Sequence, residues 1–439
     1  MKKRILNILF WSIISAAFIG PGTITTASKA GAEYGFGLLW ALVFSTLACL
    51  VLQEAVARVT IFSGKNLGEA IFIRYKESAV LPIILILVIG AIVLGSAAYE
   101  TGNILGAVAG LKFLIPWNNA VLVLGIALMA VIALSLPSLR SIAHLMGYIV
   151  VIMGASFFTT AILLKPDIGA IFHGAFIPSI AENSTAGILV LGLIGTTVVP
   201  YNLFLGSVIA DKNQSIKEMR FGLSIAIILG GLISMSVLIT GSFVEGQFSF
   251  ESLVKTLSST LGQIAVWIFG IGMLAAGISS AITAPLASAL TAKSLFQHRD
   301  KAKWGEKSLY FRAVWGFVLL VGVGFGLTNL KPIPAIILAQ ALNGLILPFI
   351  SIFLVLIIND PRIMGKKNIN GILSNSLLMI VVWITLVLGI LNILKAIQSI
   401  LPANILLSNY SLRINYVVSS IIWLSVLIYV IRIRRKGSV

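Results

Sequence analysis

Apolar segments of about twenty residues recur along almost the whole chain. Its 439 residues are 59% hydrophobic and 10% charged, whereas a soluble domain carries about 25% charged residues. Because about 20 apolar helical residues cross the hydrocarbon core of a bilayer, we predict an all-α membrane protein that forms a single domain over residues 1–439. We expect twelve transmembrane helices, near residues 6–32, 36–57, 79–108, 119–136, 142–164, 185–210, 219–244, 261–296, 309–328, 333–358, 372–398 and 414–433.

Two of these spans contain residues that interrupt a helix. The first span contains Gly-Pro-Gly-Thr at 20–23, and the sixth contains Val-Pro-Tyr-Asn at 199–202. Proline lacks an N–H group and clashes with the preceding turn, so we predict unwound backbone at 20–23 and 197–202. Lipid cannot satisfy the freed backbone groups, so each break must line a cavity enclosed by protein, where the two breaks face one another.

A pair of broken spans, each opening a set of about five helices, is typical of inverted-repeat secondary transporters. Such transporters hold their substrate between the two breaks. We therefore expect one repeat over about 6–164 and a second over about 185–358. The two helices within about 372–433 are then additions to the repeats.

The distribution of basic residues predicts the topology. Short loops rich in Lys and Arg stay on the cytoplasmic side. With the N-terminus inside, 24 of the 31 basic residues fall in cytoplasmic connections and 6 fall outside, while Lys29 lies within a span. This pattern predicts a multi-pass protein of the cell membrane with both termini cytoplasmic, and we read the outside connections as loops. It also explains the net charge of +17 without nucleic acid, because the chain has no basic polar domain.

The first residues, Met-Lys-Lys-Arg followed by an apolar run, also resemble a secretory signal peptide. The spans that continue directly afterwards favour an uncleaved first helix. The single cysteine excludes a disulfide framework and a cysteine zinc site. We expect no cofactor and no enzymatic activity.

Several segments from the first to the tenth span resemble the Nramp family of metal transporters, whose first helix carries Asp-Pro-Gly-Asn and whose sixth carries Met-Pro-His-Asn. The matching segments lie at 20–23, 30–40, 52–53, 63–69, 199–205, 277–283, 338–340 and 347–349. The resemblance implies a LeuT-type fold with five plus five helices in its repeats, of which helices 1 and 6 are broken. It also implies a cation substrate that moves with or against protons.

This chain departs from the family where the family binds metal. Gly20 stands at the position of the metal-binding aspartate, Thr23 at that of the asparagine and Val199 at that of the methionine. A thioether favours softer transition metals, whereas oxygen ligands suit magnesium and manganese. Without a carboxylate, a dehydrated ion would face only neutral dipoles, and magnesium dehydrates reluctantly. We therefore assign no metal-ligand set, and we expect the smaller side chains to enlarge the pocket for a hydrated ion or an organic solute.

The candidate substrate-binding residues lie at the two breaks and in the tenth span, where the family's backbone carbonyl and glutamine are retained. They are Gly20, Thr23, Thr196, Thr197, Val199, Tyr201, Asn202 and Gln340. We expect a secondary transporter of a hard divalent cation, magnesium or manganese, largely hydrated and coupled to or accompanied by protons. The alternative is a metal-independent transporter of a small polar or anionic organic solute, and a channel-like or sensory membrane protein is a rival from another class.

Ionisable residues within spans are candidates for a proton pathway. Glu100 in the third span is the first of these, with a structural buried acid as the alternative. Lys29 and Glu33 lie one helical turn apart, so an ion pair is the simpler interpretation. In the other interpretation, Lys29 attracts an anionic group of the substrate.

Overall fold

The computed structural model describes residue 11 and residues 19–136, 140–179, 184–298, 300–328, 330–398 and 409–436, and every regular element in this part of the chain is a helix. Nine helical segments there are long and apolar enough to cross a membrane, and 119–135 and 147–163 form two shorter apolar helices. Together they provide a counterpart for every predicted span except the first. Of the first span, residues 6–10 and 12–18 lie outside the described residues.

The bounds of the helices agree closely with the predicted spans. In chain order they are α2 (Pro21–Tyr34), α3 (Leu39–Ser63), α4 (Leu67–Tyr75), α5 (Leu81–Lys112), α6 (Asn119–Ser135), α7 (Arg140–Leu163), α8 (Ile168–Phe176), α9 (Ser184–Thr197), α10 (Pro200–Ile209), α11 (Ile216–Gly241), α12 (Phe250–Leu261), α13 (Ile264–Phe296), α14 (Leu309–Gly326), α15 (Pro332–Ile358), α16 (Pro361–Met364), α17 (Ile372–Gln398) and α18 (Asn409–Lys436).

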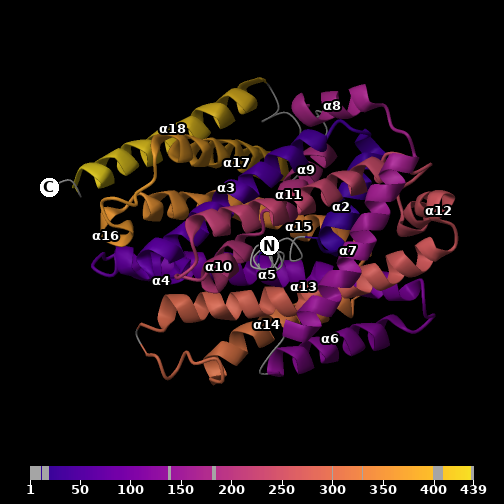
Figure 1. The fold of residues 1–439 in the computed structure, drawn as a ribbon, viewed down its shortest axis with the longest axis horizontal. Helices are drawn as coiled ribbons and strands as arrows, with labels where there is room; N and C mark the ends of the chain where they lie inside the picture. Colours follow the sequence, from indigo (N-terminus) through magenta and orange to yellow (C-terminus); the bar gives the residue numbers. More distant parts are fainter. Residues whose placement is uncertain are drawn as a thin grey trace.

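The helices form a bundle around α2 (Figure 1). α2 contacts α5, α9, α11 and α15, while α5 packs along α13 and α15 packs along α9. α6 and α14 lie along one edge of the bundle, and α17 and α18 lie along the opposite edge. This arrangement places the first turn of α2 and the last turn of α9 in the interior.

The break in the sixth span occurs at the predicted proline but is shorter than predicted. α9 ends at Thr197, and α10 begins at Pro200 after the extended residue Val199. Proline is favoured at the first position of a helix because its missing N–H would have no intrahelical acceptor there. The proline therefore starts a new helix, and only residues 198 and 199 are non-helical. The expectation that Thr197, Tyr201 and Asn202 are unwound is wrong.

The described part of the first span also begins a helix at a proline. α2 begins at Pro21, and Gly20 is its extended N-cap residue with φ −113° and ψ −176°. Thr23 therefore lies in the first turn of α2, so the prediction that it is unwound is also wrong. A Cβ atom placed on Gly106 of α5 would lie 2.1 Å from Cβ of Pro21, so α5 packs directly on this helix start.

Two of the outside connections, which we read as loops, contain further helices, α8 and α12. On the predicted inside, α4 and the four-residue α16 are also additional helices. α12 begins with a capping box in which the hydroxyl of Ser249 accepts a hydrogen bond from the backbone N–H of Ser252, and the hydroxyl of Ser252 accepts one from the N–H of Ser249. These reciprocal bonds satisfy N–H groups that a helix start leaves free. α12 packs against α7, α11 and α13.

Candidate transport site

The two breaks meet in the interior of the bundle. Oγ1 of Thr23 in α2 lies 2.7 Å from Oγ1 of Thr196 in α9, within hydrogen-bonding distance. Both side chains are completely buried. The prediction that the two breaks face one another is therefore confirmed.

The amide of Gln340 closes the site from α15. A Cβ atom on Gly22 would lie 2.1 Å from Nε2 of Gln340, so the amide lies directly over the α2 backbone. Gln340 is fully buried, and neither its Nε2 nor its Oε1 has a hydrogen-bond partner among the described residues. An unsatisfied buried polar group costs about 1–3 kcal/mol. The amide is therefore in place to bind a ligand or its water.

Two hydroxyl groups surround the position where a side chain at residue 20 would extend. A Cβ atom on Gly20 would lie 3.1 Å from Oγ of Ser280 and 3.9 Å from the hydroxyl oxygen of Tyr99. The ring of Tyr99 packs edge to face on that of Tyr201, with 5.5 Å between the ring centroids. The two buried rings take up space beside the break, which limits the enlargement expected from the smaller residues.

The remaining candidates in the sixth span contribute in different ways. The hydroxyl of Thr197 donates to the backbone carbonyl of Leu193 at 2.9 Å, so it is engaged within its own helix. The side-chain amide of Asn202 is buried, and its atoms have no hydrogen-bond partner in the described part of the chain. Val199 is also buried and adds only apolar surface.

Glu100 is fully buried in α5 on the side that faces α14. Its Oε2 accepts a hydrogen bond from Nδ2 of Asn103 at 3.2 Å, and its Oε1 has no partner among the described residues. A Cβ atom on Gly322 of α14 would lie 2.6 Å from Cγ of Glu100, so the two helices touch at this carboxyl group.

Lys29 and Glu33 do not join the buried site. They form an ion pair with each other further along α2, where their side chains are partly exposed. The simpler interpretation of this pair is therefore confirmed. Lys29 also lines a separate cavity near α12.

Tyr99 and Ser280 are site residues that the sequence interpretation missed. Neither residue is among the substrate-binding residues predicted from the sequence. The only signal for either is the missing side chain at Gly20. Among the described residues, no group of three or more His, Cys, Asp or Glu side chains could hold a metal ion. The side chains named above present hydroxyl and amide groups.

A buried polar site between interrupted helices, within a bundle of apolar helices, is typical of membrane transporters with a LeuT-type fold. Mhp1, a nucleobase-cation-symport-1 family transporter, shares this fold with a TM-score of 0.56 and 13% identity over 98% of this chain and 94% of that chain. The Nramp family model, described as natural resistance-associated macrophage protein-like, matches residues 12–395. The chain belongs to the Nramp family, whose members are transporters.

The relatives have few residues identical to this chain, but they align with most of its length. A Bacillus subtilis protein named divalent metal cation transporter MntH is 27% identical over 376 residues, which cover 81% of this chain and 84% of that protein. The Yersinia pestis protein of the same name is 26% identical over 302 residues, covering 65% of this chain and 72% of that one. The crystal structure of the Eremococcus coleocola manganese transporter aligns with a TM-score of 0.71 and 21% identity over 98% of this chain and 94% of that chain.

Proposed function

We propose that this protein is a secondary transporter of a hard divalent cation, magnesium or manganese, which passes the central site with most of its water shell. Relatives named as divalent metal cation and manganese transporters support the substrate class. The neutral polar groups at the two breaks support the hydrated state. The observation that carries the proposal is the pairing of Thr23 with Thr196 at the position where the two broken helices meet.

Neutral groups suit a hydrated ion better than a bare one. Hydroxyl and amide oxygens accept hydrogen bonds from coordinated water, whereas replacing that water requires ligands that compensate for dehydration. Gln340 offers an amide oxygen that has no hydrogen-bond partner among the described residues. Because residue 20 is a glycine, it places no side chain in front of the hydroxyl of Ser280. The site therefore selects by hydrogen bonding and size rather than by direct coordination.

Glu100 is the proposed proton carrier. Burying a carboxyl group in a membrane helix costs free energy, so such groups usually have a partner or serve a function. Within the described residues its one hydrogen-bond partner is the neutral amide of Asn103, and no ion pair compensates its charge there. Glu100 also lies one residue from Tyr99, whose hydroxyl borders Gly20, which supports coupling to the substrate site.

We also infer that both termini and the connection between α10 and α11 are cytoplasmic. The inference is supported by the 24 basic residues that this orientation places inside. We also infer one domain with repeats over about 6–164 and 185–358. It is supported by the packing of α5 along α13 and of α9 along α15, both beside α2.

The proposal is tested by restoring a carboxylate at the first break. In calorimetric titrations of the purified protein, Gly20→Asp should bind manganese at least about tenfold more tightly than the parent, because a direct anionic ligand replaces outer-shell contacts. Gly20→Asn is the matched control, since it has the same size without the charge. Equal affinities for both variants would contradict the view that the missing carboxylate at the first break limits metal binding.

A second candidate is a transporter of a small polar or anionic organic solute. It is favoured by the buried amides of Gln340 and Asn202, whose nitrogen atoms lack acceptors in the described part of the chain. These donors suit a carboxylate or carbonyl oxygen. Saturable binding of an amino acid or organic acid, without any metal dependence and weakened by Gln340→Leu, would favour this candidate over the first.

A further inference from the structure

A cavity of about 610 Å³ lies apart from the central site, at the ends of α2 and α5 and beneath α12. We call it the vestibule. Its charged lining residues are Lys29 of α2, Lys112 of α5, Glu251 of α12 and Lys331 before α15. Its volume falls within the range of pockets that hold small molecules.

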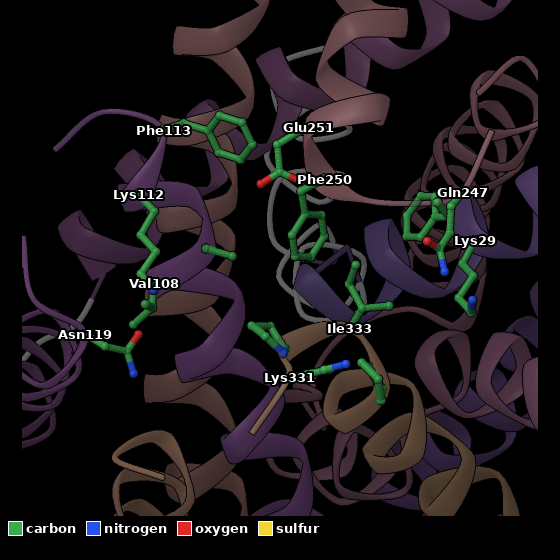
Figure 2. Close-up of a pocket in the computed structure, with 14 residues that line it drawn as sticks. Lys29, Val108, Lys112, Phe113, Asn119, Gln247, Phe250, Glu251, Lys331 and Ile333 are labelled. Atoms are coloured by element: carbon green, nitrogen blue, oxygen red, sulfur yellow. The ribbon is translucent and has the colours of Figure 1, made fainter. Parts of the chain in front are cut away.

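Positive charge dominates the vestibule. Figure 2 shows Lys112 on one side, Lys29 on the opposite side and Lys331 between them. Lys29 is neutralised by its ion pair with Glu33. Lys112 and Lys331 are exposed and have no ion pair within the described residues, so their charges are available to a ligand.

The start of α15 adds to this field. Lys331 is the N-cap residue of a 27-residue helix whose first turn contains no acid, and the N-cap side chain makes no capping hydrogen bond. The N-terminal end of a helix carries about half a positive charge. Glu251 supplies the only carboxylate among the lining residues of the vestibule.

Basic residues gather at the vestibule although they are rare on the predicted outer side of the chain. Only six basic residues fall on the predicted outer side, yet Lys112 and Lys331 both line this one cavity. They come from α5 and α15, which pack against each other. A solvated surface of scattered lysines would not converge in this way.

We propose that the vestibule binds a small oxyanion with two or more negative charges, such as a dicarboxylate or phosphate, between Lys112 and Lys331. The helix end of α15 contributes to binding, and Glu251 weakens it. The proposal does not rest on the identity of the substrate at the central site. The ligand of this cavity would carry a charge opposite in sign to that of a metal cation.

The test is a calorimetric titration of the full-length protein in phosphatidylcholine nanodiscs. Succinate and inorganic phosphate are the probes, at constant ionic strength and without divalent cations. The parent should bind at least one probe saturably. The double variant Lys112→Gln/Lys331→Gln should weaken binding by about tenfold or more, whereas Glu251→Gln should strengthen it because a repulsive charge is removed.

Lys255→Gln is the matched control, because Lys255 is an exposed lysine of α12 that does not line the vestibule. It should leave binding unchanged, and thermal unfolding of all variants reports whether they remain folded. Absence of saturable binding, or equal binding by the parent and a folded double variant, overturns the proposal. Displacement of the probe by phosphatidic acid in the nanodisc, whose phosphomonoester can carry two negative charges, supports the site and identifies a lipid headgroup as an occupant.

Because these titrations contain no divalent cation, their failure would leave the metal titrations of Gly20→Asp unaffected. Conversely, a failure of the metal titrations would leave the oxyanion site standing. The two proposals are therefore separable.

Discussion

The hydroxyl groups of Thr23 and Thr196 lie 2.7 Å apart although 173 positions separate the two residues in the sequence. One comes from the first turn of α2 and the other from the last turn of α9. This pair joins the two proposed repeats at the point where both of their first spans are broken. Any movement of one repeat against the other must keep, stretch or break this contact.

Removal of the Thr196 hydroxyl should weaken substrate binding. Thr196→Val keeps the shape of the side chain but leaves Thr23 without this partner, and such a loss is worth about 1 kcal/mol, or roughly five- to tenfold in affinity. Thr197→Val is the control, since that hydroxyl donates within its own helix to Leu193. Equal affinities of the two variants in a binding titration would show that the hydroxyl pair does not serve the substrate.

Glu100→Gln should flatten the pH dependence of transport. Glutamine keeps the size and hydrogen-bonding capacity of Glu100 but cannot exchange a proton. Transport and proton flux are measured in liposomes over a range of pH. Glu33→Gln serves as a control because Glu33 pairs with Lys29 outside the buried site. A Glu100→Gln profile identical to that of the parent would mean that Glu100 is only structural.

Asp360 should stabilise the fold at neutral pH. It is buried between Arg74 and Arg362, both of which form ion pairs with it. Burial opposes its ionisation, but hydrogen bonds from Arg362 and the charge of Arg74 hold the pKa of Asp360 below its usual value. A carboxyl group with a lowered folded-state pKa contributes stability above its unfolded-state pKa of about 3.9, and this contribution is lost as the pH falls through the folded-state pKa.

The corresponding variant is Asp360→Asn, which leaves Arg74 buried without its anionic partner. Breaking a buried ion pair in this way costs about 3–5 kcal/mol. The thermal stability of the parent should exceed that of Asp360→Asn at pH 7, and the difference should shrink as the pH falls below about 4. A difference that stays constant down to pH 3 would rule out the ion pairs as its source.

The connection between α10 and α11 should be inaccessible from outside the cell. Asn213→Cys in a Cys49→Ser background places a single thiol in this exposed connection. An impermeant maleimide should label it only after the cells are opened, while Lys255→Cys on α12 should react in intact cells. Labelling of Asn213→Cys in intact cells would invert the proposed topology.

The fold was largely predictable because its main signals are local. Apolar length locates the spans, and Pro21 and Pro200 locate the helix starts that form the breaks. The extent of unwinding was overestimated, because proline at the first helical position starts a helix as effectively as it interrupts one. Both Thr23 and Asn202 consequently lie inside helices.

The composition of the site was only partly predictable. Gly20 and Gln340 were identified from the resemblance to the family, but the approach of Tyr99 and Ser280 to Gly20 depends on how α5 and α13 pack, which no local pattern records. The convergence of Lys112 and Lys331 has the same origin. Each lies at a helix end, and only the contact between α5 and α15 brings them to one cavity.

Competition between magnesium and hexaamminecobalt(III) tests the central claim most directly. This complex exchanges its ligands very slowly and resembles a fully hydrated magnesium ion, so it binds only where direct coordination is not required. The account predicts that it displaces magnesium from the purified protein, and that manganese binds no more tightly than magnesium. Failure of the complex to compete, together with manganese binding at a Kd of about 1 μM or below, roughly −8 kcal/mol, would contradict a hydrated ion at a neutral site.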